Sequence, residues 1–265
     1  MNYSPSTLNV ADIELFAENL DVKRAGEIYQ EHGCLVVRGL MKPYIEAITR
    51  DIEETAQQSI ALLDSAKRIP EGWTTPDGTL FIPAPGNYNR DKQIMVLGVG
   101  YFTSAAFFQS AFDKTTLDIV ESILGSNIEL FLNGQCLYKE PVGGHPKKLH
   151  QDAAYFEHRY QGPVATLNYC VWTWDRAVPI VGQAGDSIFF AVHTIHGSQE
   201  NHSEKARPVF IHRYRSADDY VVIGASTVEK RTEAEKHIAE AKKENQRGLM
   251  VRGFRPFTVE ANDKL

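Results

Sequence analysis

Three side chains on two strand-like segments have the chemistry of a transition-metal site. His150 and Asp152 lie in the segment Lys148–Phe156, where alternation along a strand would point both side chains to one face. His196 ends the apolar segment Ser187–His196, and an imidazole buried there would need a partner. Two histidines and one carboxylate form the facial triad that binds Fe(II) and leaves coordination positions open for O2. The residues therefore predict a mononuclear iron centre.

An arginine near the third of these residues could bind an organic acid. Arg207 follows His196 by eleven residues and directly precedes the apolar strand-like segment Pro208–Arg215. An arginine that enters a core needs an anion, and the distal carboxylate of 2-oxoglutarate suits the two-pronged guanidinium. The polar stretch Asn201–Lys205 predicts a hairpin turn that would bring His196 and Arg207 together. A structural ion pair of Arg207 is the alternative.

Composition limits the classes of partner. The 265 residues suffice for one domain, and 28 basic against 34 acidic side chains give a net charge of −6. The basic residues are scattered, which argues against a nucleic-acid partner. No apolar run reaches the length of a membrane span, and the N-terminus lacks the pattern of a signal peptide. Three cysteines do not form a disulfide framework, so we expect a cytoplasmic protein without a membrane partner.

Helical patterns dominate the first part of the chain. Apolar spacing and end signals predict helices over Ile13–Leu20, Val22–His32 (ended by Gly33), Tyr44–Lys67 and Thr115–Leu124. The stretch Ile69–Asn89 is rich in proline, glycine and asparagine and carries Trp73, Phe81 and Tyr88, so it predicts a loop folded over a pocket. This part, residues 1–125, is predicted to support the site.

Short strands follow one another in residues 126–216 without helices between them, which favours an antiparallel jelly roll. The predicted strands are Ile128–Lys139, Lys148–Phe156, Val164–Trp174, Val178–Val181, Ser187–His196 and Pro208–Arg215. Residues 217–265 contain a charged helical pattern, Val228–Gln246, typical of a solvated face. The fold class predicted is therefore mainly β with flanking helices (α+β), a double-stranded β-helix core with N-terminal helices and a C-terminal helix, in a single domain.

The sequence resembles the phytanoyl-CoA dioxygenase family of Fe(II)- and 2-oxoglutarate-dependent oxygenases. The likeness rests on LHQDAAYF (149–156), CVWTWD (170–175) and GDSIFFAVHTIHGSQENHSEKARPVFIHRY (185–214). It implies the iron ligands His150, Asp152 and His196. It also implies 2-oxoglutarate contacts by Arg207, Ser198, Trp172 and Gln135. An intact Asp152 favours oxygenation over halogenation, because related halogenases leave that ligand position to chloride.

The resemblance implies a dioxygenase that hydroxylates or otherwise oxidises a small-molecule metabolite, with release of succinate and CO2. A compound of natural-product biosynthesis is one candidate substrate, and a homodimer is one candidate assembly. Side chains that could face the substrate are Tyr155, Phe156, Trp174 and Arg213. Two alternatives stay open: a jelly-roll metalloprotein whose chemistry does not use 2-oxoglutarate, and a catalytically silent binding module.

Two departures from the family pattern stand out. The family reads Lys-Pro-Pro where this chain has Lys139-Glu140-Pro141. Only 43 residues separate Asp152 from His196, fewer than relatives have. The shortfall follows the tryptophan segment, where relatives carry a lid loop. We therefore hypothesise that a lid segment is missing between Asp175 and Arg176.

Overall fold

Strands outnumber helices in the part of the chain that the computed structural model describes, so the fold is a mixed α+β one. That part is residues 8–65, 73–75, 78–83, 94–132, 134–154, 173–217 and 248–255. The α-helices are α1 (Val22–His32), α2 (Lys42–Ser65), α3 (Ala105–Ser110) and α4 (Lys114–Leu124). Short 3-10 turns are η1 (Val10–Asp12), η2 (Ala17–Asn19), η3 (Asp152–Ala154) and η4 (Trp174–Arg176).

The strands form four sheets in the described residues rather than one closed barrel. One sheet has the order β1 (Glu14–Phe16), β2 (Cys34–Arg38) and β9 (Ser187–Phe190). The largest has the order β11 (Arg207–Ile211), β7 (Gln135–Lys139), β5 (Ile94–Leu97), β4 (Gly78–Pro83) and β3 (Trp73–Thr75). A third joins β12 (Tyr214–Ser216), β6 (Ile128–Leu130) and β13 (Leu249–Arg252). The fourth pairs β10 (His196–Ser198) with β8 (Lys147–His150).

Local capping chemistry explains why two helices lie where the sequence predicts them. The Asp21 carboxylate accepts a hydrogen bond from the backbone N–H of Arg24 at the start of α1, and Gly33 ends the helix at a φ of 67°. Asp113 caps the start of α4, and Gly125 ends it. The long helix α2 also forms, with Pro43 in its first turn, where no N–H is needed.

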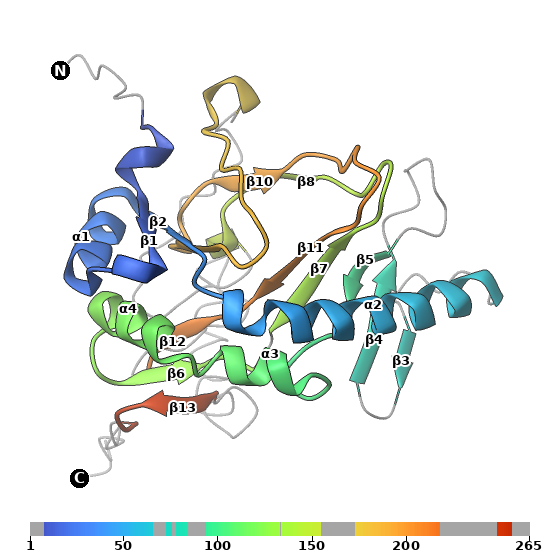
Figure 1. The fold of residues 1–265 in the computed structure, drawn as a ribbon, viewed down its shortest axis with the longest axis horizontal. Helices are drawn as coiled ribbons and strands as arrows, with labels where there is room; N and C mark the ends of the chain where they lie inside the picture. The colour runs from blue at the N-terminus through green and yellow to red at the C-terminus, as the bar shows by residue number, and fades with distance from the viewer. Residues whose placement is uncertain are drawn as a thin grey trace, which may run out of the picture.

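Two apolar cores hold these layers together. Helix α2 lies along the five-stranded sheet (Figure 1) and packs Ile48 and Ile52 against Phe81, Ile94 and Leu97 of its strands. The second core surrounds β2, whose apolar residues are fully buried between α1, α4 and β9. None of the helices in the described part combines the length and hydrophobicity that membrane crossing requires.

A polar cluster lies against the first core, with Ser110 fully buried and His212 partly buried. The Tyr101 hydroxyl lies 2.9 Å from Nδ1 of His212, and the Ser110 hydroxyl lies 2.8 Å from its Nε2. Because Ser110 Oγ donates its proton to the carbonyl of Phe107, it must accept from Nε2–H, which fixes the tautomer of His212. The rings of Phe107, Phe210 and Tyr214 surround this imidazole. We call Tyr101, Ser110 and His212 the sealed cluster.

Some predicted elements are wrong in the N-terminal part. Residues 13–20 form β1 between two 3-10 turns rather than a helix, because β1 pairs in parallel with β2. The predicted loop 69–89 contains β3 and β4, and Phe81 of β4 lies in the core. Strand β5 and helix α3 were not predicted. Tyr88 and the predicted helix Val228–Gln246 lie outside the described residues.

Several predicted long strands are broken in the structure. The segment 128–139 divides into β6 and β7, the segment 187–196 ends as β9 at Phe190, and 208–215 divides into β11 and β12. Residues 178–181 form no strand, and most of the predicted strand Val164–Trp174 lies outside the described residues. The hairpin predicted around 201–205 is wrong, because β11 pairs with β7 while β10 pairs with β8.

The hypothesis of a missing lid segment is also wrong. Asp175 and Arg176 are consecutive residues of η4, and the backbone N–H of Arg176 bonds to the carbonyl of Thr173 at 3.3 Å. The chain therefore runs without interruption from residue 174 into residue 177.

Candidate active site

The two candidate histidine ligands face each other across a short antiparallel ladder. His150 is the last residue of β8, His196 is the first of β10, and the two are direct partners in the register. Their rings lie 4.3 Å apart between centroids, at 47°. Directly opposed residues of paired strands project to the same face of a sheet. Pairing thus brings together two side chains that are far apart in the sequence.

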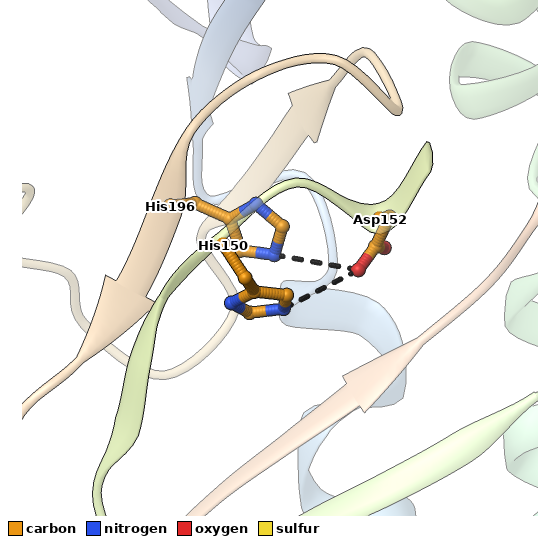
Figure 2. A group of neighbouring side chains, drawn as sticks. All are labelled: His150, Asp152 and His196. Atoms are coloured by element: carbon orange, nitrogen blue, oxygen red, sulfur yellow. Dashed lines mark ion pairs between the residues drawn. The ribbon is translucent and has the colours of Figure 1, made fainter. Parts of the chain in front are cut away.

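Asp152 reaches the same point from a turn rather than from the predicted strand. Strand β8 ends at His150, and Asp152 begins η3. The backbone N–H of Ala153 bonds to the carbonyl of Val192 at 2.8 Å, which holds this turn against the chain before His196. The Oδ1 atom of Asp152 lies 3.4 Å from Nε2 of His150 and 3.8 Å from Nε2 of His196. Figure 2 shows the three side chains converging.

Backbone carbonyls orient both imidazoles. Nδ1 of His150 lies 2.8 Å from the carbonyl oxygen of Lys148, and Nδ1 of His196 lies 2.9 Å from that of Thr194. A carbonyl can only accept, so each Nδ1 carries a proton, and in a neutral ring the Nε2 then keeps its lone pair. In the neutral form of each ring, its Nε2 lone pair faces the carboxylate of Asp152, and a metal ion bound there would be shared by all three side chains.

Thr194 is itself held by the cap of the first long helix. Its hydroxyl donates to the carbonyl of Gly33 at 2.6 Å, and the backbone N–H of Ala191 donates to the same oxygen at 2.9 Å. The ring of Phe190 packs 4.4 Å from the ring of His196. The left-handed glycine that ends α1 therefore also fixes the turn that orients His196.

The charges of the site favour a metal over a proton. Burial raises the pKa of Asp152, but the neighbouring His150, His196 and Arg213 outweigh burial and leave this pKa below its ordinary value. Burial lowers the pKa of His196, although the hydrogen bond to Thr194 opposes the shift. Both shifts, toward an ionised Asp152 and a neutral His196, favour the protonation states that metal binding requires.

The donor set fits an iron ion. One ligand atom from each of His150, Asp152 and His196 lies within 4.8 Å of the others, and the side chains are 15%, 21% and 28% exposed, respectively. No other such group of three occurs among the described residues. Two imidazoles and one carboxylate with open positions suit non-haem Fe(II). We call these three residues the triad.

The surroundings of Arg207 differ from the prediction. The residue begins β11 opposite Lys139 and is exposed, so it does not enter the core. Its Nη2 donates to the carbonyl of Gln199 at 2.7 Å, three residues beyond His196. The apolar pattern after Arg207 suggested burial, but the first three residues of β11 are exposed.

Other candidate co-substrate residues fall on neighbouring strands. Ser198 lies two residues after His196 on β10, and Gln135 begins β7 opposite Ile211. Trp172, the remaining candidate, lies outside the described residues. Lys139 had no assigned role, although a lysine within an apolar strand pattern is a signal. It is 8% exposed and donates to the carbonyls of Ser198 at 3.0 Å and Gln199 at 2.7 Å.

The candidate substrate residues are only partly described. Tyr155 and Phe156 lie outside the described residues. Trp174 is half exposed in η4, and its ring would lie 2.9 Å from a Cβ added at Gly197, beside His196. The charge of Arg213 acts on Asp152, and burial lowers the pKa of this arginine. Trp174 and Arg213 therefore both lie in the neighbourhood of the triad.

The comparisons with known proteins identify a family for this chain. The sequence model described as phytanoyl-CoA dioxygenase (PhyH) matches residues 29–174 and 168–209. No curated protein sequence matches the chain.

Three solved structures share the fold. The non-haem monooxygenase ThoJ, in its apo form, has a TM-score of 0.52 at 14% identity, covering 88% of this chain and 84% of that one. The α-ketoglutarate-dependent carbocyclase SnoK from nogalamycin biosynthesis has a TM-score of 0.51 at 16% identity, covering 91% and 97%. EctD from S. alaskensis, solved with 2-oxoglutarate and 5-hydroxyectoine, has a TM-score of 0.50 at 14% identity, covering 82% and 84%.

Proposed function

This chain belongs to the phytanoyl-CoA dioxygenase family of 2-oxoglutarate-dependent non-haem iron oxygenases, and we propose that it hydroxylates a small organic metabolite at the triad. The observation that carries the proposal is the orientation of the two imidazoles. Both Nδ1 atoms are held by backbone carbonyls, so both Nε2 atoms face the carboxylate of Asp152. Such hydrogen bonds are typical of histidines that bind metals.

Each residue of the triad has one task in the proposed reaction. His150, Asp152 and His196 hold the iron, and the carbonyls of Lys148 and Thr194 keep both rings in the binding tautomer. The bound metal with 2-oxoglutarate and O2 supplies the oxidation, in which succinate and CO2 are released. Three protein ligands leave the remaining positions for the co-substrate and O2.

Arg207 and Ser198 are the proposed contacts for the co-substrate, with Trp172 and Gln135 completing its pocket. Arg207 bonds to the backbone of the strand that carries His196, so its guanidinium has a fixed place near that strand. Its free N–H groups can donate to a carboxylate. An exposed position does not oppose this role, because the co-substrate itself would cover the side chain.

The substrate is proposed to lie beside Asp152 and Trp174, with Tyr155 and Phe156 as further contacts. The charge of Arg213 near Asp152 favours a metabolite with an acidic group. ThoJ and SnoK are named as a monooxygenase and a carbocyclase, and SnoK belongs to nogalamycin biosynthesis, which supports a role in natural-product biosynthesis. We propose further that the sheets belong to a double-stranded β-helix.

Anaerobic titration tests the proposal directly. Addition of Fe(II) and then 2-oxoglutarate should produce a weak visible charge-transfer band and consume the co-substrate once O2 is admitted. The band should vanish in His196→Ala, whereas His202→Ala, an exposed histidine on the neighbouring turn, should keep it. A wild-type protein that binds Fe(II) but gives no band would instead support the metalloprotein alternative, and no iron binding at all would support a silent binding module.

A further inference from the structure

The ladder that carries both histidine ligands is irregular directly beside them. Its first pair is His196 with His150, and its second pair is Ser198 with Lys147. The step between these pairs covers two residues of β10 but three residues of β8. Two residues of β8 therefore oppose Gly197 alone, which is the arrangement of a β-bulge. Such a bulge changes the direction of the side chains around it.

Beyond the bulge the two segments keep one register. Three residues further along each segment than the pair Ser198–Lys147, Gly144 and Asn201 form an antiparallel bridge. The backbone N–H of Asn201 donates to the carbonyl of Gly144 at 3.1 Å, and the N–H of Gly143 donates to the carbonyl of Asn201 at 2.7 Å. The bridge and this pair therefore share a register, from which the histidine pair differs by one residue.

The bulge persists because its two sides are held in different registers. On the ligand side, the backbone N–H of Ala153 donates to the carbonyl of Val192 at 2.8 Å and fixes the turn after β8. On the other side, the bridge of Asn201 fixes the segment before β8. Release of the bridge would let this segment shift by one residue and take up the extra one, so that Lys148 would pair with Ser198.

The orientation of His150 depends on the bulge. The carbonyl that lies 2.8 Å from its Nδ1 belongs to Lys148, which is one of the two bulged residues. In a regular ladder a carbonyl lies in the plane of the sheet, whereas side chains stand perpendicular to it, so the carbonyl of Lys148 would not face this ring. The bulge thus supplies the bond that directs Nε2 of His150 toward Asp152.

The side chain of Asn201 secures the bridge. The residue is 4% exposed, and its Nδ2 donates to the carbonyl of Glu140 at 3.0 Å, on the segment that leads into β8. The same amide donates to the carbonyl of Lys205 at 2.7 Å, and its Oδ1 accepts from the hydroxyl of Ser203 at 2.8 Å. The last two bonds keep the amide turned toward Glu140. A shift of one residue would break the bond to Glu140 and leave a buried amide with fewer partners.

Val142 shows how firmly these contacts fix the chain before β8. Among the described residues, it is the one residue other than glycine with a positive φ, at 51°. A β-branched side chain disfavours this left-handed conformation. The backbone N–H of Val142 donates to the carbonyl of Ser203 at 3.0 Å, two residues after Asn201. The bonds between the two segments therefore hold Val142 in a conformation that it would otherwise avoid.

We infer that Asn201 is a positioning residue for the metal site, because it preserves the bulge in β8 and so keeps the imidazole of His150 directed at the metal. The inference rests on the proposed function, since it concerns the ligands of the triad. The competing explanation is that Asn201 only stabilises the turn between β10 and β11. The two explanations differ in whether the effect of Asn201 on metal binding passes through His150.

A double-mutant cycle with His150 tests that difference. The probe is Cu(II), which a site of this kind binds more tightly than Fe(II), and its EPR spectrum reports how many imidazole nitrogens are bound. Asn201→Ala should weaken Cu(II) binding about 10- to 100-fold, the loss expected when the outer partner of a metal-binding histidine is disturbed. In the His150→Ala background there is no ring left to direct, so the same substitution should change the affinity by less than about 2-fold.

Two further variants keep the outcomes distinct. Asn127→Ala removes another asparagine that bonds to the backbone, since its Oδ1 accepts from the N–H of Phe254, and should leave Cu(II) affinity unchanged. Ser203→Ala removes an exposed hydroxyl that orients the Asn201 amide. It should weaken Cu(II) binding a few-fold, again only when His150 is present, and it decides the test if Asn201→Ala does not fold.

Urea unfolding of each variant gives the folded fraction to which the Cu(II) affinities refer. If folded Asn201→Ala binds Cu(II) within about 2-fold of wild type, or if it loses the same factor in both backgrounds, Asn201 has only a structural role and the inference is overturned. The same two results from Ser203→Ala would overturn it if Asn201→Ala does not fold. A wild-type spectrum without two bound imidazole nitrogens would instead contradict the proposed metal site itself.

Discussion

Two histidine clusters in this molecule use the same side chain in opposite ways. In the sealed cluster, both ring nitrogens of His212 have neutral hydroxyl partners, and aromatic rings surround it. In the triad, each Nδ1 has a backbone carbonyl, and each Nε2 faces the carboxylate of Asp152. The partners of His212 lie within the fold, whereas the triad offers three ligand atoms to a cation.

The difference shows that burial alone does not identify a functional histidine. Burial lowers the pKa of both His196 and His212, and that of His212 falls to about 3. Its surroundings nevertheless satisfy every polar atom of the ring, which indicates a structural role. The pattern of partners on Nδ1 and Nε2 distinguishes a metal ligand from a core residue.

The largest expected effect is on metal binding, which should distinguish the triad from the sealed cluster. His150→Ala should weaken Fe(II) binding by more than about 100-fold, because losing even an outer hydrogen-bond partner of a ligand costs 10- to 100-fold. The free energy of unfolding of the metal-free protein should change by less than about 1 kcal/mol, since no bond of the core is lost. Isothermal titration with Fe(II) under argon measures the first quantity and urea unfolding the second. Unchanged iron affinity would remove the distinction between the clusters.

The reverse pattern is expected for the sealed cluster. His212→Ala should lower the free energy of unfolding by about 3 kcal/mol, because it opens a cavity and leaves the hydroxyls of Tyr101 and Ser110 without their ring partner. Iron affinity of the folded fraction should stay within about 2-fold of wild type. Urea unfolding and Fe(II) titration in the same buffer measure both. A large loss of iron affinity in a folded His212→Ala protein would contradict the comparison.

Lowering the pH should reduce the free energy of unfolding through the sealed cluster, by a smaller amount than these substitutions. The unfolded chain protonates this histidine near pH 6.5, whereas burial keeps the folded pKa at about 3. Between these two pH values, the unfolded state binds one proton more than the folded state. The contribution of His212 to the free energy of unfolding is therefore fully present above pH 6.5 and is lost as the pH falls. From pH 7 to pH 5 the loss should be about 2 kcal/mol.

The groups that face His212 do not cancel this dependence. Burial raises the pKa values of Tyr101 and Tyr214, so both stay neutral in this range, and Arg213 stays charged. Urea midpoints at pH 7, 6 and 5 measure the effect. His212→Asn should show a shallower slope than wild type. Parallel slopes would assign the acid sensitivity to another group, such as His196, whose pKa is also lowered by burial.

The smallest effect concerns the link between helix cap and triad. Thr194→Val keeps the shape of the side chain but loses the hydrogen bond to the carbonyl of Gly33. We expect a loss of about 1 kcal/mol in stability. Iron affinity should fall only a few-fold, because the carbonyl of residue 194 still accepts from His196. Thr103→Val, whose hydroxyl also bonds to a backbone carbonyl but on the turn before α3, is the matched control and should leave iron affinity unchanged.

Residue types and local spacing predicted which side chains form much of the site, but not the contacts that bring them together. The triad was predicted from residue types, and the structure does bring its one carboxylate and two imidazoles together. Strand alternation was expected to place Asp152 beside His150, yet a 3-10 turn held by Val192 does so. Alternation describes one segment at a time, and the bond between Ala153 and Val192 joins two.

Non-local pairing explains the errors in the fold as well. The helix α1 and its glycine cap were predictable because their signals lie within a few residues. Residues 13–20 have helical spacing, but parallel pairing with β2 makes their centre a strand. Arg207 was expected to enter the core because apolar residues follow it, whereas the partner of β11 proved to be β7 rather than β10. Which strands meet depends on the whole chain.

The geometry of the site depends on the lack of a side chain at Gly197. A Cβ there would lie 2.8 Å from the carbonyl of Lys147 and 3.1 Å from the backbone nitrogen of Leu149, in addition to the Trp174 ring. A single methyl group would therefore push apart the strands that carry His150 and His196. Metal binding thus depends on glycine, which has only a hydrogen atom as its side chain, at the position directly after one of the ligands.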